Sequence, residues 1–562
     1  MIEAIFSFII TLILILVHLI TGSGDNDISG DISDISGDIS GGISGDISGG
    51  ISGGISGDSN YNDNTSVSIY NGGGSSIQNK LARKYNGIRK KAKLVSRIPF
   101  DKYCSPRKFS LQPQQIIASD YVGSGNSLLI YHRIGAGKTC LSIQCGLKRL
   151  KYGKPVFIMP ASLIPGWWDE VNGNCSDGKL TEDNCKVYSY NKFSTEESSL
   201  NRLKPSLIVI DEVQNITGGG TFYKSALRYI LKHPNTPVVL MSATPIFDRP
   251  DELVKIANLL RINVQSIEPN EIRTLFDGKV SYYAGAPSHV FPEVRLKIQK
   301  CVMSRHQAKW FRSDVKAEIT DRGGVKLSPA QNDFYINSRQ RSNIAYPQGL
   351  KNNIQLLKQS NLEQCSAKFS ILIKRLLRGK LSFVYSGFTG GGGIAAIVRV
   401  MELNGFRDYF KHGPGRRRFA VWSGDQSAET KRVIRNVFND PANDNSSQMQ
   451  VIIGSPSIKE GVSLLRVRVV HVMEAYWNHS RLEQIYGRAV RYCSHKRLEK
   501  EDRRVSIYLY CGITDDKSLT KTDPMRSIDY YMLSLADEKE ELKAPYLREL
   551  MNVAIDRQIY YA

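Results

Sequence analysis

Short apolar runs rich in β-branched residues recur along the chain, separated by segments long enough to form helices. The runs fall in two series: 127–132, Val156–Met159, Leu207–Ile210 and Val238–Met241, then Phe383–Tyr385, Phe419–Trp422, Val451–Ile453, Val469–Val472 and Val505–Leu509. Strands that alternate with helices form a parallel sheet covered on both faces, so each strand can be apolar throughout. The sequence therefore predicts an α/β protein with two parallel-sheet lobes.

A chain of 562 residues is too long for one hydrophobic core and predicts several domains. The predicted divisions are 1–21 as a hydrophobic leader or membrane anchor, 22–79 as a low-complexity linker, 80–260 as lobe 1, 261–360 as a bridging insertion, 361–515 as lobe 2 and 516–562 as a helical C-terminal element. The last division rests on the helical spacing of apolar residues between positions 527 and 561.

The first 79 residues differ in composition from the rest. Residues 4–20 are almost entirely apolar, which is at the short limit for a helix that spans a bilayer. A secretory signal begins with basic residues, whereas Glu3 precedes this run, so two interpretations stay open: a membrane anchor and a disordered leader. The tandem Ile-Ser-Gly units between positions 27 and 58 have too little hydrophobic bulk for a packed repeat and predict a flexible spacer of low order.

The positive charge of the chain lies in its predicted folded part. The chain has 75 lysine and arginine residues against 54 aspartate and glutamate residues, a net charge of +21. The first 79 residues hold nine of the acidic residues and no basic ones, so 80–562 carry 75 basic against 45 acidic residues. This excess favours contact with phosphate polyanions, either nucleic acid or anionic lipid.

The nine cysteines are scattered, without a CxxC pair. An odd number without metal-binding spacing disfavours both a zinc ribbon and a disulfide framework. The sequence predicts reduced thiols that serve as small core residues.

A glycine-rich turn, HRIGAGKT, follows the predicted strand at 127–132 and precedes a helix-like segment. Gly135 and Gly137 would let backbone N–H groups face an anion, Lys138 would reach the β- and γ-phosphates, and Thr139 would ligate magnesium. His132 stands where the first glycine of the phosphate-loop pattern is expected, so a coincidental glycine turn is the alternative.

Two carboxylates, Asp211 and Glu212, follow the strand at 207–210, at the edge where open α/β sheets bind ligands. Beside a phosphate loop, Asp211 would hold magnesium and Glu212 would orient and deprotonate the attacking water; a solvated turn is the alternative. The SATP sequence at 242–245 follows the next strand. Its small hydroxyl groups either contact the carboxylates and couple them to a second site, or cap a helix.

Lobe 2 contains the sequence RLEQIYGRAVRYCSH, in which Arg488 and Arg491 are spaced to share one helix face. An arginine supplied from the opposite side of a cleft stabilises the charge that develops in phosphoryl transfer. These arginines would complete the site when the lobes close, whereas a solvated basic helix face is the alternative.

The ordered set FSLQPQQ, GAGKT, DEVQ, SATP, GSPSIKEGVSL, EAYWN and QIYGRAVR resembles the motifs of superfamily 2 helicases and translocases over nearly all of 80–562. The segments GKVSYYAGAPSHVFPEV and SIDYYMLSLADEK most resemble the large-DNA-virus branch, which includes poxvirus nucleoside triphosphatase I and the early transcription factor small subunit. The resemblance implies two RecA-like lobes with ATP and magnesium as cofactors.

The same resemblance implies a role for each matching residue. Gln115 would recognise adenine, and the other residues that bind ATP would be Gly135, Ala136, Gly137, Lys138, Thr139 and Gly461. Thr139 and Asp211 would hold magnesium, and the catalytic residues would be Asp211, Glu212, Gln484, Arg488 and Arg491. Coupling between the lobes would involve Gln214, Ser242 and Thr244. Glu460 would also face the nucleotide. Gln214 stands where many relatives have histidine, and the leader and repeat are outside the family pattern.

These features predict an ATP-driven motor on DNA or RNA in the host cytoplasm or virion of a large DNA virus, acting in early transcription with a viral RNA polymerase or transcription factor subunit. The alternatives are a nucleic-acid-stimulated ATPase without unwinding, a non-catalytic scaffold and a membrane-tethered enzyme. Candidate nucleic-acid contacts are 160–162, Tyr190, Ser386, Ser455, 374–380 and 416–418, and Trp167, Trp168 and Trp477 either stack on bases or fill the core.

Overall fold

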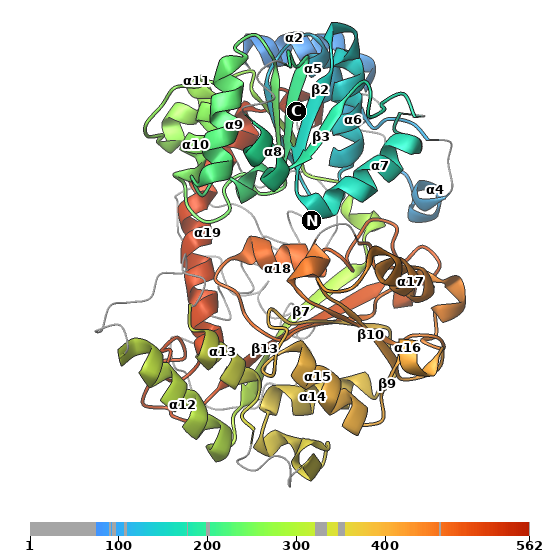
Figure 1. The fold of residues 1–562 in the computed structure, drawn as a ribbon, viewed down its shortest axis with the longest axis vertical. Helices are drawn as coiled ribbons and strands as arrows, with labels where there is room; N and C mark the ends of the chain where they lie inside the picture. Colours follow the sequence, from blue (N-terminus) through green and yellow to red (C-terminus); the bar gives the residue numbers. More distant parts are fainter. Residues whose placement is uncertain are drawn as a thin grey trace, which may run out of the picture.

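Two parallel β-sheets packed between helices form the two lobes of the computed structural model (Figure 1). The structure describes residues 75–88, 92, 97–105, 109–176, 178–197, 203–320, 334–346, 354–459 and 462–560. Lobe 1 holds β1 to β6 and is uppermost in Figure 1, and lobe 2 holds β7 to β13. The predicted fold class, α/β with two parallel-sheet lobes, is confirmed.

The sheet of lobe 1 has the strand order β3-β2-β4-β5-β1-β6, and its pairings are parallel. Its strands are β1 (Leu128–His132), β2 (Pro155–Met159), β3 (Lys186–Ser189), β4 (Leu207–Asp211), β5 (Val238–Ser242) and β6 (Val280–Tyr283). Every residue of β1, β2, β4 and β5 is buried, as expected for strands covered on both faces. These are the four strands that the apolar runs predicted.

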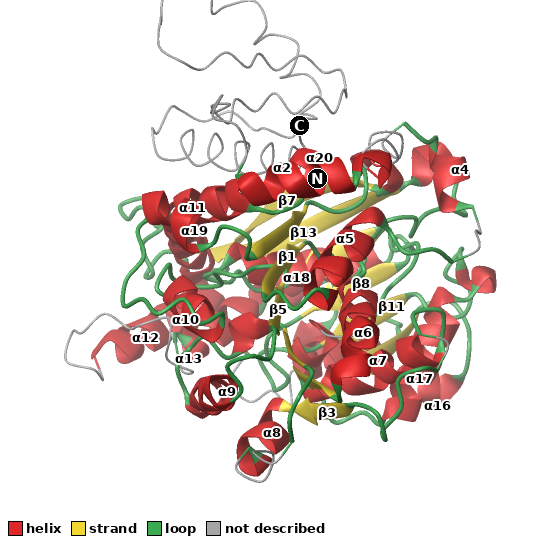
Figure 2. Ribbon diagram, turned by 90° about the horizontal axis from the view of Figure 1, so that it is seen from above, coloured by secondary structure: helices red, strands yellow, loops and turns green. Residues whose placement is uncertain are grey.

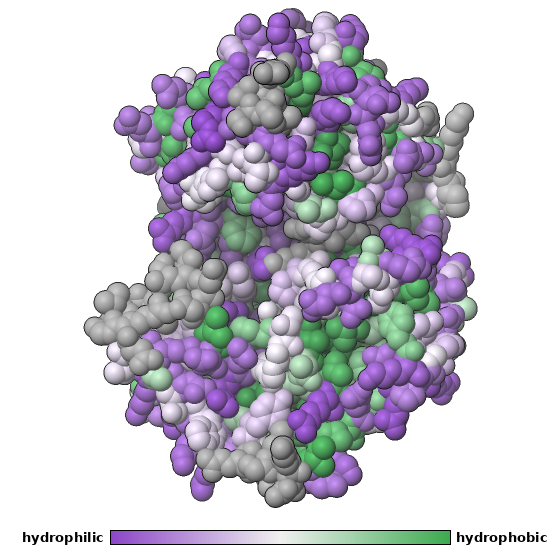
Figure 3. Space-filling view, viewed as in Figure 1, coloured by the Kyte–Doolittle hydropathy of each residue, from purple (hydrophilic) through white to green (hydrophobic). Residues whose placement is uncertain are grey.

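The sheet of lobe 2 has the order β7-β13-β12-β8-β11-β10-β9 and is also parallel. Its strands are β7 (Glu293–Val302), β8 (Ser382–Tyr385), β9 (Arg407–Asp408), β10 (Arg418–Trp422), β11 (Val451–Gly454), β12 (Val469–Val472) and β13 (Arg504–Ile513). All five predicted runs of the second series are strands here. Apolar side chains are more frequent on lobe 2 than on lobe 1 in the face that Figure 3 shows.

Helices pack on both sheets. Those before β7 are α2 (Ser76–Lys84), α4 (Phe100–Cys104), α5 (Pro113–Gly123), α6 (Lys138–Arg149), α7 (Ile164–Asn172), α8 (Tyr190–Glu196), α9 (Thr221–Lys232), α10 (Glu252–Leu259) and α11 (Ile272–Leu275). Those after it are α12 (Arg305–Thr320), α13 (Ile336–Asn343), α14 (Ala367–Leu376), α15 (Ile394–Leu403), α16 (Tyr409–His412), α17 (Ala428–Asn439), α18 (His479–Tyr486), α19 (Ile528–Val553) and α20 (Arg557–Tyr560).

The range predicted as a bridging insertion contributes a strand to each sheet. β6 pairs with β1 in lobe 1, and β7 pairs with β13 in lobe 2 over ten residues. Most residues of β7 are exposed or half-buried because it is the edge strand of its sheet. Its sequence, EVRLKIQKCV, therefore lacks the continuous apolar run that marks the central strands.

The predicted helical C-terminal element is α19 followed by α20. α19 runs along one side of the molecule from lobe 2 to lobe 1 (Figure 1), and Figure 2 shows α20 beside α2 at the top of lobe 1. The first half of α19 contributes Ile528, Met532 and Leu533 to the core of lobe 2. Its last turn contributes Leu550 and Val553 to the core of lobe 1.

Residues 1–74 lie outside the described residues, and with them the predicted leader or anchor at 1–21 and most of the predicted linker at 22–79. α2 begins inside that linker range, because Ser75 and Gln78 form a capping box in which each side chain bonds the backbone N–H of the other. Among the described residues, no helix combines the length and apolarity that a membrane crossing needs.

The prediction that all nine cysteines are reduced thiols is wrong. Disulfides join Cys104 to Cys493 and Cys140 to Cys175, and the remaining five cysteines are free and buried. The partners are 389 and 35 positions apart, so no local spacing reveals either pair. One bond connects α4 to the segment after Arg491, and the other connects the first turn of α6 to the chain after α7.

Candidate nucleotide site

The glycine-rich turn between β1 and α6 has the backbone of an anion-binding loop. Gly135 and Gly137 have φ values of 80° and 76°, in the left-handed region that glycine adopts without strain. A Cβ atom at Gly137 would lie 2.6 Å from Nε2 of Gln115, so a larger residue there would also displace the Gln115 side chain. α6 begins at Lys138, and its N-terminus therefore opens directly from this loop.

The amino group of Lys138 lies inside the loop. Its Nζ donates to the carbonyl oxygens of His132 at 3.0 Å and Arg133 at 3.5 Å. Burial lowers the pKa of Lys138, the carboxylates of Glu212 and Asp211 oppose this, and nearby arginines of lobe 2 act with burial. The lysine thus lies within the electrostatic influence of the two carboxylates at the end of β4.

His132 replaces the first glycine of the pattern without changing the course of the loop. Its buried ring accepts or donates a hydrogen bond through Nε2 with Oγ of Ser281, 2.8 Å away. Burial lowers the pKa of His132 to about 3, and the charge of Lys138 adds to this effect, so the ring is neutral at pH 7. The departure from the pattern is therefore a packed core residue that leaves Gly135 and Gly137 in place.

Gln115 connects the preceding segment to the loop. Its Oε1 accepts from the backbone N–H of Gln112 at 2.8 Å, and its Nε2 donates to the carbonyl of Gly137 at 3.0 Å. The neighbouring Gln114 donates to the carbonyl of Ala136 at 3.3 Å. Both glutamines thus fasten α5 to the loop, and recognition of adenine by Gln115 stays a prediction.

A chain of hydrogen bonds links the carboxylates after β4 to the segment after β5. Glu212, which has a φ of 52°, accepts at Oε2 from Nε2 of Gln214 at 2.6 Å. Oε1 of Gln214 accepts from the hydroxyl of Ser242 at 2.7 Å, and Oγ of Ser242 accepts from the N–H of Thr244 at 2.9 Å. Gln214 therefore makes both contacts, donating to one partner and accepting from the other.

The backbone around the two carboxylates is also fixed. The N–H of Glu212 donates to Oδ1 of Asp211 at 2.9 Å, and the hydroxyl of Tyr190 donates to the carbonyl oxygens of both residues. Contact of Tyr190 with nucleic acid stays a prediction; its hydroxyl bonds the backbone of the carboxylate pair. An aromatic residue at the start of α8 carried no sequence signal for this role.

The arginines of lobe 2 follow α18, which begins at His479 and ends at Tyr486. The prediction that Arg488 and Arg491 share one helix face is therefore wrong, because both lie in the irregular segment after the helix ends at its C-cap, Gly487. The guanidinium of Arg491 donates to the carbonyls of Gly487 at 3.3 Å and Val462 at 3.2 Å. Burial lowers the pKa of Arg491. Gln484 lies on α18 itself, whereas Glu460 and Gly461 lie outside the described residues.

Side chains of the two lobes share one electrostatic environment at the loop. The charges of Arg488 and Arg491 act on Lys138, as do those of the carboxylates after β4. The pKa of Arg133 in the loop is raised: burial alone would lower it, but Glu483 on α18 together with Tyr282 and Tyr131 outweighs burial. The structure thus brings the predicted residues of lobe 2 near those of lobe 1.

The residues present fit a magnesium-bound triphosphate. Thr139 and Asp211 offer a hydroxyl and a carboxylate, hard oxygen ligands of the kind magnesium takes. Gly135 and Gly137 hold the loop in the left-handed conformation that turns N–H groups toward an anion. Lys138 adds a positive charge inside the same loop.

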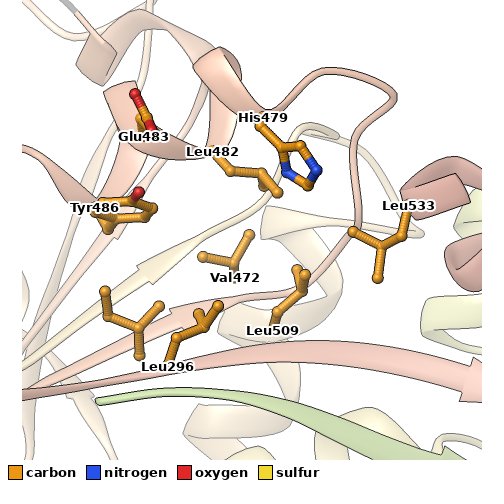
Figure 4. A pocket seen from close by; sticks show the side chains of 9 residues that line it. Leu296, Val472, His479, Leu482, Glu483, Tyr486, Leu509 and Leu533 are labelled. Atoms are coloured by element: carbon orange, nitrogen blue, oxygen red, sulfur yellow. The ribbon is translucent and has the colours of Figure 1, made fainter. Parts of the chain in front are cut away.

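α18 rests on the sheet of lobe 2 above a small apolar cavity of about 20 Å³ (Figure 4). The cavity is lined by Leu296, Val472, His479, Leu482, Glu483, Tyr486, Ile507, Leu509 and Leu533. The carboxylate of Glu483 points away from the apolar side chains in Figure 4. α18 itself packs into the core of lobe 2 through Leu482 and Ile485.

The serines and tryptophans among the predicted nucleic-acid contacts are buried or half-buried. Ser386 and Ser455 are buried and bond Glu474 and Ser457, respectively. Trp167 is 1% exposed and lies in the core of lobe 1, which answers the choice between stacking and core for this residue. Trp168 and Trp477 are half-buried and pack against the cores of lobes 1 and 2.

Comparisons with known proteins agree with this arrangement. Residues 393–493 match the family model of the helicase conserved C-terminal domain. A protein of Acanthamoeba polyphaga mimivirus named as an ATP-dependent RNA helicase is 35% identical over 535 residues, covering 82% of this chain and 91% of the relative. The early transcription factor 70 kDa subunit of Rabbit fibroma virus is 25% identical, covering 75% of each chain.

A protein of Invertebrate iridescent virus 3 named as a helicase is 27% identical over 519 residues, and this chain spans about half of its length, 51%. Two parallel-sheet lobes, with a phosphate loop in one and two arginines directly after α18 in the other, define a helicase-type ATPase. The chain belongs to the superfamily 2 helicases, in the branch found in large DNA viruses.

Proposed function

We propose that this chain is a nucleic-acid-stimulated ATPase that moves along a strand as its two lobes open and close. The observation that carries the proposal is the environment of Lys138, on which charges from both lobes act: Asp211 and Glu212 from lobe 1, Arg488 and Arg491 from lobe 2. A site assembled from two lobes is complete only when they close, so hydrolysis and lobe movement are coupled.

Each residue has a distinct part in the proposed hydrolysis. Lys138 and the backbone of the glycine-rich loop bind the phosphates, and Glu212 orients the attacking water and accepts its proton. Gln214 holds the Glu212 carboxylate through its 2.6 Å hydrogen bond. Arg488 and Arg491 stabilise the negative charge that develops on the γ-phosphate. Magnesium, held by Thr139 and Asp211, would neutralise phosphate charge when bound.

The nucleic acid would lie across both lobes, and the protein would contact its backbone phosphates without sequence selection. The large excess of basic residues in 80–562 supports a polyanionic partner. A role in early viral transcription, with a viral RNA polymerase or transcription factor subunit as partner, is supported by the similarity to the poxvirus early transcription factor subunits. Such a protein would act in the host cytoplasm or in the virion.

The test is the ATPase rate of the full chain, titrated with single-stranded and duplex DNA and RNA. We expect at least one of these polymers to raise kcat, and we expect Lys138→Ala and Glu212→Gln to abolish turnover. Lys148→Ala is the matched control, because Lys148 lies on the same helix as Lys138 and its side chain is 46% exposed. A rate that none of the four polymers changes would refute stimulation by nucleic acid.

A strand-displacement assay with the stimulating polymer separates unwinding from translocation alone. Displacement of a labelled strand that depends on ATP and on Glu212 would establish a helicase. ATP hydrolysis without displacement would support the alternative, a nucleic-acid-stimulated ATPase without unwinding.

A further inference from the structure

α19 is anchored in both lobes and is the longest helix among the described residues. Its first turns belong to the core of lobe 2, and its last turn belongs to the core of lobe 1. The lobe 1 end is fastened by Nε2 of Gln78, which donates to the carbonyls of Asn552 at 3.1 Å and Ala554 at 2.9 Å. Arg273 also forms an ion pair with Glu549. Neither end is free to slide along its lobe.

The middle of α19 contacts a two-residue loop of lobe 1, Phe247 and Asp248. Lys539 forms an ion pair with Asp248, and Nζ of Lys543 donates to the carbonyl of Phe247 at 3.4 Å. The side chains of Lys539 and Lys543 are only 12% and 1% exposed. A lysine is rarely buried unless its charge is paired. Lys539 is paired with Asp248 on the loop, whereas Lys543 is paired with Glu540 on α19 itself at 3.0 Å and reaches the loop through its hydrogen bond to Phe247.

A third contact reaches the same loop from the start of α18. Asn478 is the N-cap of α18, where its Oδ1 accepts from the N–H of Ser480 at 2.9 Å. The Nδ2 of the same side chain donates to the carbonyl of Phe247. His479 then joins α18 to α19 through a 2.6 Å hydrogen bond with Asp537. The loop, α18 and α19 thus form a closed triangle of polar contacts.

The loop is hydrogen-bonded to its own lobe and lies a few residues after the segment that is linked to Glu212. The N–H groups of Phe247 and Asp248 donate to the carboxylate of Glu252 at 2.6 and 3.0 Å. The loop follows Ser242 and Thr244, which are joined to Glu212 through Gln214. Hydrogen bonds and a short stretch of chain therefore connect the Glu212 carboxylate, through the loop, to α18, the helix that carries Gln484.

We propose that the 247–248 loop is a junction at which Asn478, Lys539 and Lys543 hold α18 in register with the carboxylates of lobe 1. This rests on the proposed function, and it makes these three side chains positioning residues that touch neither nucleotide nor nucleic acid. Loss of a junction contact would let the arginines after α18 depart from the geometry that catalysis needs.

The test measures ATPase kinetics of the full chain carrying Asp248→Asn or Lys539→Met. We expect kcat to fall about 10- to 100-fold while KM for ATP changes by less than about threefold, because the misplaced groups act on the transition state. Lys539→Arg keeps the charge and should restore most of kcat. Arg548→Met is the control, since Arg548 is exposed on the same helix, and it should match the parent.

The thermal unfolding midpoint of each variant is measured alongside the rate. A variant that keeps its midpoint and loses kcat supports positioning, and Asp248→Asn provides this comparison if Lys539→Met is unstable. If both junction variants keep the parental kcat while Lys138→Ala abolishes turnover, the junction proposal is refuted and the proposed function stands. Turnover that survives Lys138→Ala would instead overturn the proposed function itself.

Discussion

Replacement of Gln214 by alanine tests how Glu212, the proposed catalytic carboxylate, is held. The substitution removes the 2.6 Å hydrogen bond to Glu212 and the 2.7 Å hydrogen bond from Ser242. A hydrogen bond to a charged group contributes about 1.5–3 kcal/mol. If that contribution is needed in the transition state, its loss lowers kcat about 10- to 150-fold. KM for ATP should change little, because Gln214 binds the carboxylate and not the phosphates.

Steady-state ATPase assays with saturating nucleic acid provide the measurement. Ser242→Ala removes only a neutral hydrogen bond of about 0.5–1.5 kcal/mol, so it should cost about 2- to 10-fold. The double variant should be no slower than Gln214→Ala, because both changes interrupt one chain of contacts. Gln214→His, which supplies the residue common in relatives, should keep a donor to Glu212 and recover most of the rate. A Gln214→Ala variant within twofold of the parent would refute the reasoning.

Three further predictions concern stability. The buried carboxylate of Asp529 lies 2.8 Å from Nζ of Lys368. Lys368→Met leaves this carboxylate without its cation and should lower the free energy of unfolding in urea by about 3–5 kcal/mol. A loss below about 1 kcal/mol would contradict this. Burial lowers the pKa of His471 to about 3, below the ordinary value of 6.5. The free energy of unfolding should therefore fall by about 1.4 kcal/mol per pH unit as the pH drops from 6.5 towards 3, because the unfolded chain binds the proton first. His471→Gln should show a shallower pH dependence of the free energy of unfolding than the parent, and an equal one would contradict this. Cys175→Ser opens the 35-residue loop closed by Cys140 and should lower the free energy of unfolding by about 4 kcal/mol under oxidising conditions, whereas an unchanged value would show that the loop is held by other contacts.

The central strands and the site loops could be predicted because their signals are local. A strand buried on both faces is apolar in every residue, and the glycines of a phosphate loop are adjacent in sequence. β7 escaped prediction because an edge strand is partly exposed and its partner, β13, lies some two hundred residues further along the chain. α19 was predicted as a helix, yet its sequence carries no sign that it joins both lobes.

The contacts that complete the site are long-range, and the sequence does not show them. The junction joins Phe247 and Asp248 to residues near 478 and 540, and nothing in the local sequence marks these as partners. The disulfides unite cysteines from separate elements in the same way. Gln214 was recognised as a departure from the family pattern, but its simultaneous contacts with Glu212 and Ser242 required the arrangement of β4 beside β5.

The central claim is that one ATP site is built from both lobes. The most direct test compares ATP binding, followed with a fluorescent ATP analogue, and ATP hydrolysis in Lys138→Ala and Arg491→Ala. We expect Lys138→Ala to lose binding, and Arg491→Ala to keep binding but lose hydrolysis by about 10³-fold. Parental hydrolysis in Arg491→Ala and in Arg488→Ala would contradict the claim.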